Sequence, residues 1–167
     1  MRSGSFLAVA AAATFAAGRA DADDGSRQGT DKGTIGIGII VGEPSGICGK
    51  LYIRDDQAVQ AAVGGAFIGG GIQAHADYVF HPYILQTRDS FVLATYVGPG
   101  VRFIQYSNGR EDSSNAIGLR AVGGLLFDFK NPLDAFVEVA GVFEYEFRDG
   151  QGAAIRLNAS AGVRYYF

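Results

Sequence analysis

Hydrophobic and polar residues alternate along most of this chain, and residues 154–167 show the pattern most clearly. The apolar positions of that segment are Ile155, Leu157, Ala159, Ala161, Val163, Tyr165 and Phe167. The positions between them are Arg156, Asn158, Ser160, Gly162, Arg164 and Tyr166. Because successive side chains of a strand point to opposite faces, the segment predicts a β-strand with one apolar face and one polar, charged face.

The same period-two pattern predicts seven earlier strands, at 34–42, 47–54, 59–67, 72–80, 91–104, 117–129 and 137–147. Short turns separate most of them, for example Glu43-Pro44-Ser45-Gly46. The strand at 91–104 is expected to be interrupted at Gly98-Pro99-Gly100, where a proline without an N–H donor argues for a bulge or an exposed donor position. We expect 82–90 to be a plain connection and 107–115 an exposed loop. The fold class is therefore all-β, an eight-stranded antiparallel up-and-down barrel.

The N-terminus has a different character from the rest of the chain. Residues 1–22 combine Arg2, a short apolar core at 6–17 and small residues up to Ala22, which predicts a secretory signal peptide. Residues 23–33 are small and polar and are expected to form a flexible leader, so the barrel domain is 34–167. No later stretch offers the roughly 20 unbroken apolar residues of a spanning helix.

Alternation alone is consistent with two barrels. A soluble, lipocalin-like barrel for ligand binding turns its apolar face inward, and a transmembrane barrel turns it outward. Aromatic residues gather at the predicted strand ends, as in the aromatic girdles of membrane barrels. A basic residue on the lipid side near the midplane costs ~2–4 kcal/mol, and six of them would exceed the ~5–15 kcal/mol of a typical domain. A membrane-spanning barrel must therefore enclose its charges.

The predicted lumen network consists of Lys50, Arg54, Asp77, Arg102, Arg120, Asp128, Glu138, Glu144, Arg156 and Arg164. Within the last hairpin we expect Glu144 to lie across from Arg156 and Glu138 to lie close to Arg164. Pairing is required because an unpaired buried charge is very costly. Such a network predicts a salt-bridged filling of the lumen, with a gated ion path as the alternative interpretation.

Other candidate chemistry is sparse. His75 and Asp77 share a strand face, which with a nearby serine would indicate a hydrolase or lipid-modifying enzyme, but no spacing places a serine beside them. His75 and His81 lack an evident third metal ligand. The net charge of −3 and the single Cys48 give no sign of nucleic-acid binding or of an internal disulfide. We therefore predict a protein that is not an enzyme and has no cofactor and no metal.

Two short motifs carry a family resemblance: Gly-Glu-Pro-Ser-Gly at 42–46 and the terminal Gly-Val-Arg-Tyr-Tyr-Phe at 162–167. The chain resembles the small outer-membrane β-barrel proteins of Gram-negative bacteria, of the OmpA-transmembrane, OmpX and OmpW type, and a group of uncharacterised barrels with these motifs. The resemblance implies a bacterial outer-membrane location, with both termini toward the periplasm. It also implies outer-membrane lipid and the barrel-insertion machinery as partners, with Val163, Tyr165 and Phe167 as the insertion signal.

The expected function follows from location and lumen together. It is a structural barrel or a narrow conduit for small solutes, rather than an open porin. The alternatives are a lipid-modifying enzyme of the outer membrane and the soluble lipocalin-like ligand-binding barrel.

Overall fold

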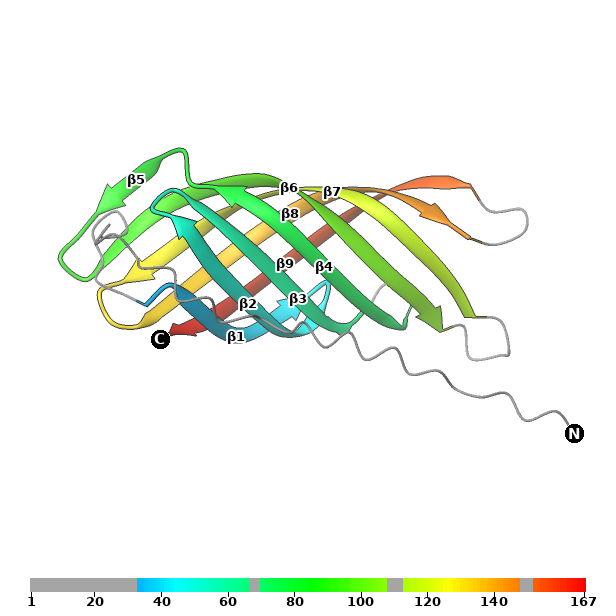
Figure 1. Cartoon of the computed structure of the whole chain (residues 1–167), viewed down its shortest axis with the longest axis horizontal. Helices are drawn as coiled ribbons and strands as arrows, with labels where there is room; N and C mark the ends of the chain where they lie inside the picture. The colour runs from blue at the N-terminus through cyan, green and yellow to red at the C-terminus, as the bar shows by residue number, and fades with distance from the viewer. Residues whose placement is uncertain (1–32, 67–69, 108–112, 148–151) are drawn as a thin grey trace, which may run out of the picture.

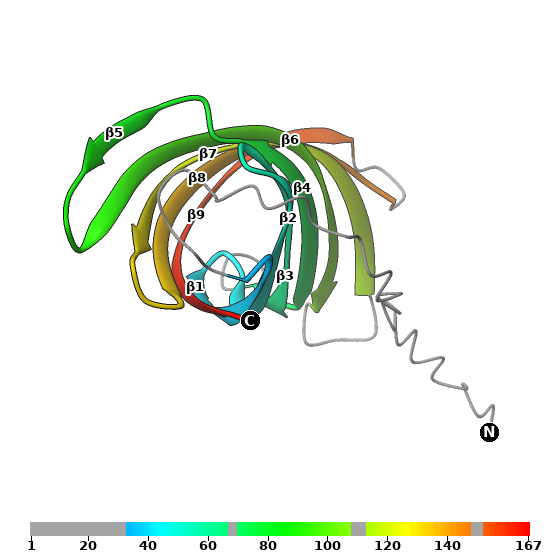
Figure 2. The same ribbon diagram turned by 60° about the vertical axis from the view of Figure 1, so that its left-hand side comes forward.

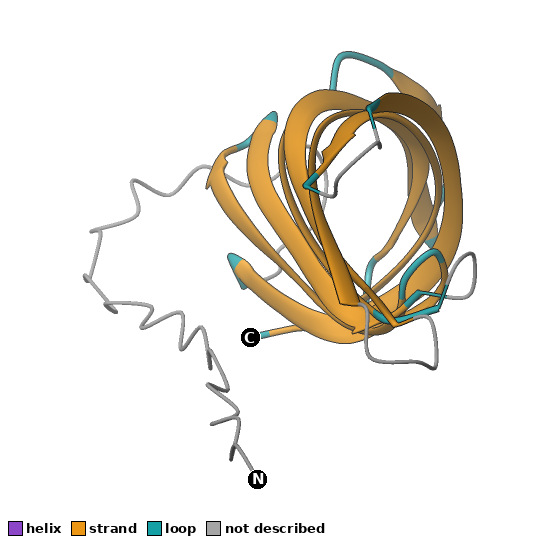
Figure 3. Ribbon diagram, turned by 90° about the vertical axis from the view of Figure 1, so that its right-hand side faces the viewer, coloured by secondary structure: helices purple, strands orange, loops and turns teal. Residues whose placement is uncertain are grey.

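The computed structural model describes residues 33–66, 70–107, 113–147 and 152–167, which form one antiparallel sheet. Its strands are β1 (Ile35–Gly42), β2 (Ser45–Arg54), β3 (Gln57–Gly65), β4 (Ile72–Phe80), β5 (Ile84–Thr87), β6 (Phe91–Ser107), β7 (Ser113–Phe129), β8 (Leu133–Glu146) and β9 (Ala153–Tyr166). The sheet order is β4-β3-β2-β1-β9-β8-β7-β6-β5, and β4 also pairs with β6. That pairing closes eight strands into an up-and-down barrel, as predicted (Figures 1 and 3).

The predicted signal peptide, 1–22, and all but the last residue of the predicted leader, 23–33, lie outside the described residues. The centre of the predicted loop at 107–115, residues 108–112, also lies outside the described residues. The ends of that predicted loop belong to strands, since β6 continues to Ser107 and β7 starts at Ser113. No helix in the described ranges is long and apolar enough to cross a membrane.

The predicted interruption of the strand at Gly98-Pro99-Gly100 is wrong. β6 runs through these residues, and its pairing with β7 continues without a register shift, Pro99 standing opposite Ala121. The irregularity is on the other side, where the β4–β6 pairs include Asp77↔Gly100 and Phe80↔Val97 but none for the residues between them. The missing proline donor is thus accommodated at a local gap in one ladder.

The segment 82–90 is not the plain connection that we expected. It contains β5, which pairs with the start of β6 and shows a register shift between Ile84 and Gln86. β5 follows β4 along the same partner strand and projects beyond the barrel wall (Figure 2). Four residues with irregular pairing give little alternation, so the pattern could not reveal this strand.

The barrel has an apolar outside and a charged inside. Phe143 is 55% exposed, whereas Arg120 and Arg164 are 3% and 2% exposed. Small residues such as Ala58, Ala62 and Ala140 share the interior with the charged groups and leave room for their long side chains. A water-soluble barrel has the reverse arrangement, so the structure decides the orientation that alternation left open.

Candidate functional site in the barrel lumen

A central cluster of charged side chains occupies the lumen. The Arg120 Nε donates to both carboxylate oxygens of Asp77, at 3.0 and 3.2 Å, and its Nη2 donates to Glu138 Oε1 at 2.6 Å. The Gln60 amide donates to both carboxylates, and the Tyr96 hydroxyl donates to Glu138 at 2.8 Å. One guanidinium therefore joins a carboxylate of β4 to a carboxylate of β8, and the neutral donors Gln60 and Tyr96 bond to Glu138 Oε2, which Arg120 does not contact.

Glycines on the intervening strands bring these partners together. Gly100 of β6 stands between Asp77 of β4 and Arg120 of β7 in the register. A Cβ at Gly100 would lie 2.0 Å from Asp77 Oδ1, so any larger residue would occupy the space through which the ion pair forms. Gly124 of β7 plays the same part between Tyr96 and Glu138.

A second cluster centres on Glu144 of β8. Arg102 Nη1 donates to one oxygen of Glu144 at 3.1 Å, and Arg156 Nε donates to the other at 2.6 Å. The Tyr106 hydroxyl adds a third hydrogen bond at 2.8 Å. Here too a glycine, Gly118, separates Arg102 from Glu144 in the register. Arg156 differs from the other paired arginines because its side chain is 40% exposed.

A third cluster lies near the end of the barrel that carries the C-terminus. Arg164 donates from Nε and Nη2 to the two oxygens of Asp134, at 3.0 and 3.1 Å, in a bidentate pair. The Tyr166 hydroxyl also donates to Asp134, and the Arg164 guanidinium lies 4.2 Å from the centre of the Phe136 ring. The three clusters use Asp134, Glu138 and Glu144 of β8, so they follow one another along the barrel.

The pairing predictions had mixed outcomes. Glu144 and Arg156 do form an ion pair, although the register places Glu144 opposite Ala154 and the arginine reaches it diagonally. Glu138 and Arg164 line the same small cavity but are not each other's ion-pair partners, because Arg164 binds Asp134 and Glu138 binds Arg120. Asp134, four residues before Glu138 along β8 and farther from the β8–β9 turn, takes the place that we assigned to Glu138.

The remaining members of the predicted network have different positions. Lys50 is buried, with its Nζ 2.8 Å from His81 Nε2, and Asp128 is also buried. Arg54 is exposed at the last position of β2, so its inclusion in an enclosed network is wrong. Its place at the strand end explains this, because the lumen no longer surrounds a side chain there.

Several lumen residues were missed in the sequence. Asp134, Gln60, Tyr96 and Tyr106 all contribute hydrogen bonds to the clusters. Asp134 shares the even-numbered face of β8 with Glu138 and Glu144, and Tyr96 shares that of β6 with Arg102, so reading every position of those faces would have found them.

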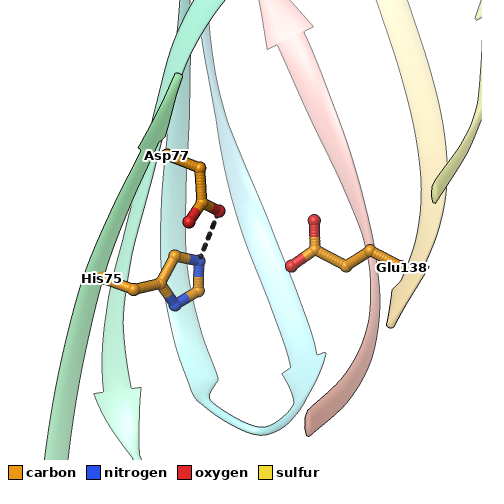
Figure 4. Close-up of side chains that lie close together, drawn as sticks. All are labelled: His75, Asp77 and Glu138. Atoms are coloured by element: carbon orange, nitrogen blue, oxygen red, sulfur yellow. Dashed lines mark ion pairs between the residues drawn. The ribbon is translucent and has the colours of Figure 1, made fainter. Parts of the chain in front are cut away.

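Buried His75, Asp77 and Glu138 form the group that most resembles a metal site, with ligand atoms within 4.8 Å of one another (Figure 4). The His75 Nε2 lies 3.8 Å from Asp77 Oδ2. However, all the carboxylate oxygens already accept hydrogen bonds, mainly from Arg120 and Gln60. A metal ion would have to displace that guanidinium, so these residues fit an ion-pair cluster better than a metal centre.

Two small cavities lie among the clusters. A cavity of about 10 Å³ is lined in part by Gln60, His75 and Glu138. Another of about 20 Å³, near the C-terminal end of the barrel, is lined in part by Tyr52, His81 and Asp128. Each volume is close to that needed for a single water molecule.

No protein-family model matches this chain, and no curated protein matches it either. Among solved structures, the crystal structure of the N-terminal β-barrel domain of Pseudomonas aeruginosa OprF is similar, with a TM-score of 0.60. The two sequences are 17% identical, and the match covers 81% of this chain and 99% of the OprF domain. At this identity the likeness shows the fold, a closed eight-stranded antiparallel barrel of the kind that OprF carries.

Proposed function

We propose that this chain is a bacterial outer-membrane β-barrel whose role is structural, with a lumen closed by ion pairs, rather than an open porin or an enzyme. The observation that carries the proposal is the separation of apolar residues on the outer face of the barrel from charged residues on its inner face. The outward positions of β8, for example, are Leu133, Ala135, Val137, Val139, Gly141, Phe143 and Tyr145. Its inward positions include Asp134, Glu138 and Glu144.

The apolar outer surface of the barrel is compatible with the hydrocarbon core of a bilayer. A contiguous apolar belt on a soluble monomer would be an aggregation hazard, whereas a bilayer requires one. Aromatic pairs at the strand ends, Tyr78–Phe80 and Tyr165–Phe167 near one rim and Tyr145–Phe147 near the other, fit the two interfaces of a membrane. The fold shared with the OprF barrel supports the same location.

The C-terminal strand supports a route to that membrane. Val163 and Tyr165 are exposed on the outer face of β9, and Phe167 is exposed directly after it, where the barrel-insertion machinery would recognise the three as the insertion signal. Outer-membrane lipid is the second partner that the exposed belt requires. The alternative to a closed lumen is a narrow path for small solutes, which would require the ion pairs to rearrange.

A charge placed on the belt tests the location. Val139 is 58% exposed in the middle of β8, so Val139→Arg should lower the free energy of unfolding of the vesicle-inserted barrel by ~2–4 kcal/mol. Val139→Ala is the matched control, and urea titration of vesicle-bound protein is the measurement. On a water-facing surface the arginine would change stability by only about 0.5 kcal/mol. That smaller value, or recovery of the protein without detergent from the soluble periplasm, would contradict the proposal.

A further inference from the structure

The barrel wall is uneven at the end opposite the C-terminus. β1 ends at Gly42, which pairs with Ser160, and the last backbone bond there runs from Glu43 N to Ala159 O at 3.0 Å. β9 continues back to Ala153, which still pairs with β8. Within the described ranges, Ala153–Asn158 therefore have a strand partner on one side only, beyond the short β1–β2 hairpin (Figure 1).

The backbone groups at this free edge can be identified. Glu43 N bonds to Ala159 O and Phe167 N bonds to Ile35 O, so the odd-numbered residues of β9 direct their backbone groups toward β1. The N–H and C=O groups of Ile155 and Leu157 consequently face the open side. Six residues at a rise of ~3.3 Å and the usual barrel tilt make an edge about 15 Å high.

Apolar side chains surround the edge on the outer face. Ile155 and Leu157 are 85% and 73% exposed, more than any other large hydrophobic residue in the described part of the chain. If the belt lies in a bilayer, backbone groups at this level cannot stay without hydrogen-bond partners. A polar group from outside the described barrel wall would satisfy them.

Donors on the inner face indicate what that group is. Arg156 bonds to Glu144 through Nε, which leaves its Nη groups, on a side chain 40% exposed, for another acceptor. Asn158 is 3% exposed, and its Nδ2 donor has no hydrogen-bond partner in the described structure. Guanidinium, amide and backbone N–H groups on one short segment together fit an acceptor-rich anion such as a phosphate.

We propose that the free edge of β9 binds the phosphate of one anionic lipid headgroup, an inference that rests on the membrane location proposed above. The phosphate accepts hydrogen bonds from Arg156, Asn158 and the backbone N–H groups of the edge, and the acyl chains lie against Ile155 and Leu157. A strand from another protein would satisfy the same backbone groups but would leave the exposed guanidinium unused.

The chain contains no tryptophan, so a single introduced one reports on its own surroundings. Leu157→Trp places the reporter at the edge. Leu119→Trp is the matched control, because Leu119 is 68% exposed on β7 and pairs with strands on both sides. Each variant is folded into phosphatidylcholine vesicles that contain a minor share of brominated lipid, either phosphatidylglycerol or phosphatidylcholine, and quenching is measured.

We expect brominated phosphatidylglycerol to associate about fivefold more strongly than brominated phosphatidylcholine at the Leu157→Trp site, and equally at the Leu119→Trp site. Adding Arg156→Gln to the edge reporter should remove the preference, whereas Arg54→Gln should retain it. If Arg156→Gln does not fold, raising the salt to about 1 M with the edge reporter alone should weaken the preference.

Three results would overturn the inference while leaving the membrane location intact. The two reporters could respond alike to both lipids, or the preference could survive Arg156→Gln or high salt. Quenching could also depend on protein density and not on headgroup, which would assign the edge to a second copy of the chain. Absence of quenching at both sites by both lipids would instead refute the membrane location, and the inference with it.

Discussion

Arg120 is the residue on which the central cluster depends. Its guanidinium bonds to Asp77 and Glu138, so the group carries two negative charges and one positive charge in an enclosed space. Gln60, Tyr96 and other neutral donors supply the remaining hydrogen bonds. A buried ion pair contributes little to stability compared with an apolar replacement, but loss of one partner leaves an uncompensated charge.

Arg120→Ala should therefore lower the free energy of unfolding by ~3–5 kcal/mol, because two carboxylates would remain buried without their cation. Urea titration of the barrel in vesicles measures the loss. Arg54→Ala is the control, since Arg54 is exposed, and it should change stability by at most about 0.5 kcal/mol. Equal effects of the two substitutions would show that the cluster is not enclosed as described.

The sequence predicts which residues face the lumen better than it predicts their partners. Alternation places Arg120, Glu138 and Arg164 on the inner face, and all three are buried. Partner choice depends on the register around the closed barrel, which alternation does not contain. Arg120 finds Asp77 two strands away, past Gly100, and that neighbour relation follows only from the pairing of β4 with β6.

Among the elements, β6 and β7 show how glycine positions determine the clusters. Gly100, Gly118 and Gly124 each lie between two hydrogen-bonded side chains of the flanking strands. A Cβ at each of these glycines would approach a neighbouring side-chain atom to 2.7 Å or less. Glycine at these positions therefore leaves room for side chains of the flanking strands to meet, in addition to allowing the sheet to curve.

Gly100→Ala tests this packing. Its Cβ would lie 2.0 Å from Asp77 Oδ1 and 2.7 Å from the Ala76 carbonyl oxygen, so we expect a loss of ~1–3 kcal/mol in unfolding free energy. Gly141→Ala is the matched control, because no atom lies within 4 Å of its added Cβ, and it should be neutral or slightly stabilising. A Gly100 variant as stable as the Gly141 variant would contradict the close approach.

Element prediction succeeded where strands are long and regular. The segments predicted at 137–147 and 154–167 correspond to β8 and β9, which pair without a register shift, although β8 already begins at Leu133, four residues before the predicted start. It failed at Pro99, which we expected to interrupt the strand. β6 continues through Pro99 because its pairing with β7 is unbroken there. It also failed at β5, whose four residues are too few for a period to be measured.

At the scale of the whole molecule, the three clusters divide the lumen into successive barriers. Along β8 they are centred on Asp134, Glu138 and Glu144, and tyrosine hydroxyls reinforce each one. Two cavities among them, of about 10 and 20 Å³, are each too small for a hydrated ion. If each cluster closes the lumen at its level, a path through the barrel requires all three to open together.

The wild-type barrel should therefore show no large, steady single-channel current in a planar bilayer, whereas an open porin in the same membrane gives one. A triple variant, Asp77→Ala, Arg120→Ala and Glu138→Ala, removes the central cluster without leaving a buried charge. It should also stay closed, because Arg102–Glu144 and Arg164–Asp134 still block the lumen on either side. Steady conductance in the wild type would refute the closed lumen. Conductance in the triple variant alone would show that the central cluster is the sole effective barrier.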